Sequence, residues 1–175
     1  NIITGLDDMA GYLTAHPDIS KFTFTGSIKT GKKIASIAAA QLKPFTLELG
    51  GNDPAIVLED ANIPEIAEKI FWGAMSNSGQ ICIAIKRLYV HESIKNNLIQ
   101  ALVNIAQTKI KLGHGLEPGV NMGPLNNLNQ LKIIEICLRD LAKNTLDNPE
   151  SYSERNLFGI QVMSLYFGVA DTYIQ

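Results

Sequence analysis

The fold of this chain is decided by one stretch, Lys21–Leu49, which reads KFTFTGSIKTGKKIASIAAAQLKPFTLEL. Its first residues, Lys21–Thr25, alternate and are β-branched or aromatic, which predicts a strand that ends at a glycine turn. The apolar face of Thr30–Leu42 predicts a helix closed by a proline. Phe45–Leu49 predicts the next strand. A strand, a helix and a strand in this order form a βαβ unit with parallel pairing, so the predicted fold class is α/β.

The residues on either side continue this pattern. Upstream, Asp7–Ala15 predicts a helix, with acidic residues where the helix dipole favours them. Downstream, the cluster Gly50–Pro54 consists of residues that break helices and strands, and we expect a domain boundary there. Ala55–Leu58 predicts a second buried strand, which would begin a further α/β unit.

The second unit is expected to alternate helices and strands as well. A helix with Pro64 in its first turn, capped by Asn62 or Asp60, is followed by the strand Lys86–His91. The helix after that strand should bury one apolar face, formed by Leu98, Leu102, Ile105 and Ala106. A glycine-rich loop over residues 113–124 and a helix over residues 128–141 complete the pattern. Beyond residue 144 the pattern loses coherence.

Composition and charge exclude several classes of partner. The chain has 175 residues, of which 46% are hydrophobic and 18% charged, as in an ordinary globular protein. A net charge of −2 provides no basic surface for nucleic acid or a membrane, and no apolar run is long enough to span one. Two cysteines, Cys82 and Cys137, are too few for a disulfide framework, and no spacing resembles a metal site. We therefore expect a cytoplasmic protein with no nucleic-acid, membrane or metal partner.

A candidate phosphate site lies between the first strand and its helix. Gly26 and Ser27, with Gly31 four residues later, place backbone N–H groups and the positive end of a helix dipole together, where a dinucleotide pyrophosphate fits. The plainer alternative is an ordinary turn. Residues 26–32 also fit most of a P-loop, but Lys33 stands where a P-loop needs Ser or Thr for Mg²⁺.

Two short sequence motifs contain the candidate reactive side chains. Glu48 ends a strand in Leu47-Glu48-Leu49-Gly50-Gly51, and Cys82 follows a glycine in Gly79-Gln80-Ile81-Cys82. A thiolate attacks carbonyl carbons, and a carboxylate desolvated by burial at a strand end can deprotonate water. Taken singly, each has a plainer interpretation: Glu48 as a carboxylate that caps the next turn, and Cys82 as a small buried hydrophobe.

Together, these motifs resemble those of the aldehyde dehydrogenase superfamily, NAD(P)-dependent enzymes that oxidise aldehydes to acids. The resemblance covers roughly residues 2–125 and includes Phe24-Thr25-Gly26-Ser27 and Met122-Gly123-Pro124-Leu125. It implies that Cys82 is the nucleophile and Glu48 the base. It also implies that Gly26, Ser27, Gly31 and Leu49 contact NAD or NADP. Where the family usually has aromatic residues before the Asn77 position, this chain has Met75 and Ser76, which concerns the shape of the substrate pocket.

The resemblance implies a domain organisation and a reaction. Residues 1–51 would be the C-terminal part of a Rossmann-like NAD(P)-binding domain, residues 52–144 the N-terminal part of a second α/β catalytic domain, and residues 145–175 an atypical tail. An aldehyde would form a thiohemiacetal and then a thioester on Cys82, and water activated by Glu48 would release the acid. The parent enzyme is expected to be a homo-oligomer.

The chain also lacks two sequence motifs of the family. Neither the upstream asparagine of the oxyanion hole nor the downstream Glu-x-Phe-Gly-Pro motif is present. The chain also starts at Asn1, without an initiator methionine. We therefore expect a fragment. The alternative hypothesis is a non-catalytic remnant of such an enzyme with negligible activity, because the loss of one oxyanion donor alone costs about a hundredfold or more in rate.

Overall fold

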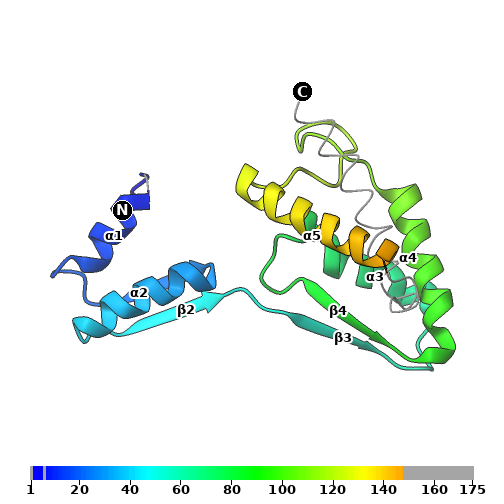
Figure 1. The fold of residues 1–175 in the computed structure, drawn as a ribbon, viewed down its shortest axis with the longest axis horizontal. Coiled ribbons are helices and arrows are strands. Elements are labelled where there is room, and N and C mark those ends of the chain that lie inside the picture. The colour runs from blue at the N-terminus through cyan, green and yellow to red at the C-terminus, as the bar shows by residue number, and fades with distance from the viewer. Residues whose placement is uncertain (1, 6, 148–175) are drawn as a thin grey trace. The chain divides into compact units, whose positions relative to one another are not determined.

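The computed structural model describes residues 2–5 and 7–147. The chain divides into two compact units, Asn1–Gly51 and Asn52–Gln175, and each is described by itself. The predicted α/β class is confirmed, because helices alternate with parallel strands in both units (Figure 1).

The first unit is the predicted βαβ arrangement, preceded by a helix. Its elements are α1 (Asp7–Ala15), β1 (Phe22–Gly26), α2 (Ile28–Ala40) and β2 (Phe45–Leu49). Strands β1 and β2 pair in parallel, from Phe22 opposite Phe45 to Gly26 opposite Leu49. Parallel strands need a crossover connection, and α2 provides it.

Helix α2 begins and ends two residues earlier than the apolar pattern predicts. It begins earlier because Ser27 caps its first turn, where the Ser27 side chain accepts a hydrogen bond from the Thr30 N–H group. It ends earlier because Leu42 adopts a left-handed backbone with φ 54°. The N–H groups of Leu42 and Lys43 then bond back to the carbonyls of Ala39 and Ala38, at 3.0 and 2.9 Å. This is the Schellman arrangement that closes helices, usually with glycine in place of Leu42.

The second unit holds a pair of parallel strands and three longer helices among its described residues. The strands are β3 (Asp53–Val57) and β4 (Ile85–Val90). The elements between and after them are α3 (Ile63–Met75), the 3-10 turns η1 (Ser76–Gly79) and η2 (Glu92–Ile94), α4 (Lys95–Lys109) and α5 (Leu128–Asp147). Cys137 lies in α5, but its side chain is outside the described residues, as are residues 148–175 of the expected tail.

Two details of this unit differ from the sequence-based expectations. The strand expected to be buried over Ala55–Leu58 buries only Val57, while Ile56 and Leu58 are 72% and 64% exposed. The reason is that successive side chains of a strand point to opposite faces. Asn62 is the N-cap of α3, but its side chain makes no cap hydrogen bond; its carbonyl oxygen accepts from the Glu65 N–H group at 3.0 Å.

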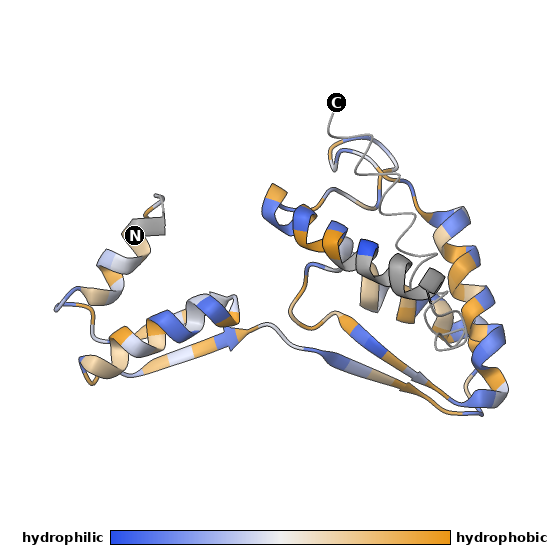
Figure 2. Ribbon diagram, in the orientation of Figure 1, coloured by the Kyte–Doolittle hydropathy of each residue, from blue (hydrophilic) through white to orange (hydrophobic). Residues whose placement is uncertain are grey.

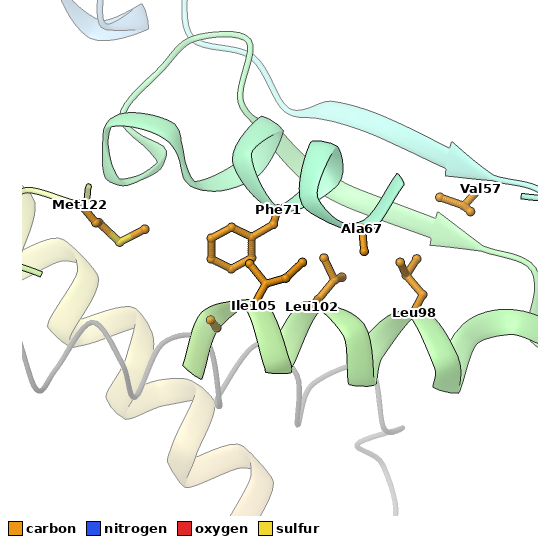
Figure 3. Packing of buried hydrophobic residues seen from close by; sticks show 8 residues of the cluster. Val57, Ala67, Phe71, Leu98, Leu102, Ile105 and Met122 are labelled. Carbon is orange, nitrogen blue, oxygen red and sulfur yellow. The ribbon is translucent and has the colours of Figure 1, made fainter. Parts of the chain in front are cut away.

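The core of the second unit lies where α3 and α4 meet. The predicted face of α4 is confirmed, since Leu98, Leu102, Ile105 and Ala106 are all buried. They pack with Val57, Ala67, Phe71 and Met122 in one cluster (Figure 3). Hydrophobic and hydrophilic residues are interleaved along α4, as expected of a helix with one buried face (Figure 2). None of the described helices is both long enough and apolar enough to cross a membrane.

Candidate active site

The carboxyl ends of β1 and β2 bring most of the predicted site residues together. Thr25 lies opposite Glu48, and Gly26 lies opposite Leu49. Ligands of open α/β sheets bind in the crevice at this end of the strands. Glu48, Gly26 and Leu49 therefore lie at one edge of one sheet, and Ser27 follows Gly26 as the N-cap of α2.

The start of α2 at this edge fits an anionic group. Ser27 Oγ accepts a hydrogen bond from the Thr30 N–H group at 3.1 Å, and the Ser27 carbonyl accepts one from the Gly31 N–H group at 2.9 Å. The remaining N–H groups of a first helical turn have no acceptor within the helix, and the dipole makes this end positive. No acidic residue lies in the first turn of α2 to repel an anion.

Gly31 allows α2 to pack closely on β2. A Cβ atom at Gly31 would lie 2.7 Å from Cδ2 and 3.1 Å from Cδ1 of Leu49, so any larger residue would displace the leucine side chain. Gly31 is buried, and Leu49 is half-buried against it. This contact sets how near the start of α2 comes to the end of β2.

Glu48 is exposed, contrary to the expected burial. Side chains alternate along β2, so Leu47 and Leu49 are half-buried while Glu48 points to the opposite face. Within the first unit the carboxylate is therefore not desolvated. Its proximity to the carboxyl edge of the sheet is retained.

The P-loop alternative does not fit the backbone. Residues 28–32 are already part of α2, so the segment forms helical turns instead of a loop around a phosphate. Helix α2 starts directly after the glycine turn.

Cys82 lies in the second unit, in a tight turn before β4. The Ala84 N–H group donates to the Ile81 carbonyl at 3.1 Å, which makes Cys82 and Ile83 the central residues of a β-turn. Cys82 is a free, exposed cysteine, so it is not the buried hydrophobe of the plainer interpretation. An exposed thiol on a fixed turn is accessible to a carbonyl compound.

A strained segment leads into this turn. Asn77, Ser78 and Gly79 all have left-handed backbones, with φ values of 50°, 59° and 73°. Such residues cost free energy, especially where a side chain is present, and persist only when surrounding contacts hold them.

The surrounding contacts come from the end of the glycine-rich loop and from the residues that directly follow it. The buried Ser78 donates through Oγ to the Gly123 carbonyl at 2.6 Å. The side chain of Gln80 donates to the Pro124 carbonyl at 3.4 Å and accepts from the Asn126 N–H group at 2.7 Å. The Met122–Leu125 motif thus anchors the motif that contains Cys82. Both motifs are recognisable in the sequence, but their contact is not, because only folding brings them together.

The contacts of Lys86 with this turn were also not predicted from the sequence. Its ammonium donates to the carbonyls of Ile81, Cys82 and Ala84 at 3.3, 3.0 and 2.9 Å, and it pairs with Asp53 at 3.4 Å. The signal in the sequence was a cation four residues after the candidate nucleophile. Among the described residues, no group of three His, Cys, Asp or Glu side chains could hold a metal ion.

Comparisons with known proteins identify the family of the chain. A sequence model of the aldehyde dehydrogenase family matches residues 1–147. The chain is 50% identical over 130 residues to a probable aldehyde dehydrogenase from a Pseudomonas species, covering 74% of the chain and 26% of that protein. It is 46% identical over 131 residues to a chloroplastic betaine aldehyde dehydrogenase from Beta vulgaris, with the same coverages of 74% and 26%.

Solved structures give the same result. An aldehyde dehydrogenase from Bacillus cereus superposes with a TM-score of 0.72 at 38% identity, over 79% of the chain and 28% of that protein. A betaine aldehyde dehydrogenase from Staphylococcus aureus in complex with NAD⁺ superposes with a TM-score of 0.71 at 34% identity, over 77% of the chain and 26% of that protein. The chain spans about a quarter of the length of these relatives. With the family model matching most of its residues, the chain belongs to the aldehyde dehydrogenase family.

Proposed function

We propose that the protein oxidises an aldehyde to a carboxylic acid with NAD⁺ or NADP⁺, with Cys82 as the nucleophile and Glu48 as the base. The observation that carries the proposal is the exposed Cys82 thiol on an anchored turn, in a chain of this family. Relatives from pea and beet are named as aminoaldehyde and betaine aldehyde dehydrogenases, so a small polar aldehyde is the proposed substrate class.

Each step assigns a task to a residue of this chain. The Cys82 thiolate attacks the aldehyde carbon, and the Cys82 N–H group donates to the oxygen that becomes negative. NAD(P)⁺, when bound, would supply the acceptor for the hydride that this carbon loses, and Cys82 would then hold the acyl group as a thioester. Glu48 removes a proton from water, and the resulting hydroxide attacks the thioester. The carboxylic acid leaves, and Cys82 is again a thiolate.

The cofactor residues are proposed on the geometry of the first unit. Gly26 and Ser27 would bring the start of α2 to the cofactor phosphates, and Gly31 and Leu49 would set the spacing between helix and strand. Residues 1–51 would then be the end of the NAD(P)-binding domain and residues 52–144 the start of the catalytic domain. A reducing, cytoplasmic setting is proposed for the whole protein, since the mechanism needs a free thiolate. A homo-oligomer is proposed for it on the resemblance to the family.

The nucleophile is tested by substitution in the full-length protein. Cys82→Ala should lower NAD(P)H formation by about 10⁴-fold or more, because it removes the covalent route. Cys137→Ala, which removes the other cysteine, is the matched control and should leave the rate within about twofold. Equal rates for Cys82→Ala and the unsubstituted protein would contradict the proposal.

The base is tested by separating the two halves of the reaction. Glu48→Gln should still form one equivalent of NAD(P)H per site in a burst and then stall, because water attacks the thioester too slowly. Mass spectrometry should find the acyl group on the Cys82 peptide. A loss of the burst itself would show that Glu48 acts before hydride transfer and not on water.

The alternative of a non-catalytic chain has its own test. The 175-residue chain is incubated with betaine aldehyde and NAD⁺, and NADH is followed by absorbance. The alternative expects no NADH above the background of the Cys82→Ala chain. NADH formation that depends on Cys82 would refute it.

A further inference from the structure

Lys86 occupies an irregular position in the second sheet. Asp53 lies opposite Ile85 and Pro54 lies opposite Arg87, so Lys86 is one extra residue in β4. Pro54 has no N–H group to donate to the ladder, and bulges occur at such positions. A bulge redirects the side chain of its extra residue. Here the Lys86 side chain turns back over the turn that carries Cys82.

The contacts of Lys86 differ from those of an ordinary surface lysine. Its ammonium lies within 3.3 Å of three carbonyl oxygens of one turn, and its side chain is 33% exposed. Lys69, by comparison, is 71% exposed and pairs with Glu65 one turn away on the same helix. A cation held by carbonyls from consecutive parts of a turn restrains the peptide planes of that turn.

We propose that Lys86 is the positioning residue for the oxyanion donor of Cys82. The proposal rests on the function given above. In a trans peptide the C=O and N–H bonds point in opposite directions. Because Lys86 and the Ala84 N–H group both hold the Ile81 carbonyl, the Cys82 N–H group is fixed on the opposite side of that peptide.

Lys86 also strengthens this donor. Hydrogen bonds to a carbonyl polarise its peptide and make the N–H group of the same peptide a better donor, and a cation does so more strongly than a neutral group. The Ile81–Cys82 peptide therefore presents a fixed and polarised N–H group. Transition-state stabilisation by such donors depends on preorganisation, so loss of Lys86 should slow reactions that develop an oxyanion.

The test compares two reactions of Cys82 in the full-length protein. Thiolate attack on p-nitrophenyl acetate forms a tetrahedral oxyanion and then expels p-nitrophenolate, leaving an acetyl thioester. Alkylation by iodoacetamide displaces iodide at a saturated carbon and forms no oxyanion. Lys86→Met should lower the acylation rate about ten- to hundredfold. The alkaline plateau of the alkylation rate should stay within about twofold.

Two further variants sharpen the comparison. Lys111→Met is the matched control, because Lys111 also donates to a loop carbonyl, that of Pro118, at 2.9 Å. It should change neither rate. Lys86→Arg keeps the cation and should recover most of the acylation rate. Lys86→Gln keeps an N–H donor without the charge, and the same split between the two reactions is expected of it if Lys86→Met does not fold.

The outcomes separate this proposal from the function on which it rests. Equal losses in both reactions would mean that Lys86 supports the fold or the thiol, and no loss in either would mean that the turn holds without it. Each result overturns the positioning role. If Cys82→Ala is acylated as fast as the unsubstituted protein, the nucleophile assignment itself has failed.

Discussion

The buried Ser78 shows how a single side chain holds a strained backbone. Its φ is 59°, in the region where L residues are disfavoured, and its Oγ donates to the Gly123 carbonyl at 2.6 Å. The hydrogen bond satisfies a carbonyl in a partly buried setting, and it joins two segments 45 residues apart in the sequence. The conformation of the turn before Cys82 thus depends on a contact with a distant loop.

Two substitutions of Ser78 separate the hydrogen bond from the backbone strain. Ser78→Ala loses the bond and keeps the strain, so the free energy of unfolding should fall by about 1–3 kcal/mol. Ser78→Gly loses the same bond but tolerates the positive φ, and should be less destabilising by about 1 kcal/mol. Urea unfolding of both variants measures the difference. Equal midpoints would show that the residue is not left-handed in solution.

At the scale of elements, α3 and α4 are joined by a charged pair as well as by the core. Lys109 Nζ donates to Glu68 Oε2 at 2.6 Å, and both side chains are about half exposed. The hydrogen bond from Lys109, followed by the attraction of its charge, holds the pKa of the Glu68 carboxyl below its usual value. The pair therefore stabilises the folded state only while Glu68 is ionised.

This pair predicts a pH-dependent effect of Lys109→Met. Because the folded-state pKa of Glu68 is lowered, its contribution is present above the ordinary glutamate pKa of about 4.3 and is lost as the pH falls through the folded-state value. The variant should be less stable than the parent at pH 7, and the difference should disappear in acid and shrink in high salt.

Lys69→Met serves as the control, since Lys69 pairs with Glu65 within one exposed helix. Its effect on the thermal midpoint should be smaller, because exposed pairs one turn apart contribute little. A Lys109→Met difference that is constant from pH 3 to pH 7 would contradict the role of Glu68.

Element types were predictable from the sequence, and some surfaces were not. The boundaries of β2 and the buried face of α4 agree with the pattern of apolar residues, because both are set by local periodicity. The exposure of Ile56 and Glu48 was not predicted. Periodicity shows that a strand has two faces, but not which parts of the molecule cover each of them.

At the scale of the whole molecule, the two units bury very different cores. Among the described residues, Ala38 is the buried hydrophobic residue of the first unit, whereas the second unit holds the cluster around Phe71 and Leu98. Burial of apolar area is the main stabilising contribution in folding. The first unit should therefore open more readily than the second.

Amide hydrogen exchange of the 175-residue chain tests this difference. Amides of α3 and α4 should exchange more slowly than those of α1 and α2, because opening the α3–α4 core exposes more apolar surface. Exchange is followed by mass spectrometry of peptides from each helix. Equal protection in the two units would mean that the first unit is stabilised by contacts outside its own core.

The sequence by itself determined the order of elements, the family and the identity of Cys82 and Glu48 as candidate reactive groups. These three features depend on local patterns and on motifs whose residues are contiguous in the chain. Only the tertiary structure decided that Lys86 is the extra residue of a bulge and that Ser78 and Gln80 reach the segment after Met122. These contacts depend on how two strands align and on chain segments up to 46 residues apart meeting in space, which no local pattern encodes.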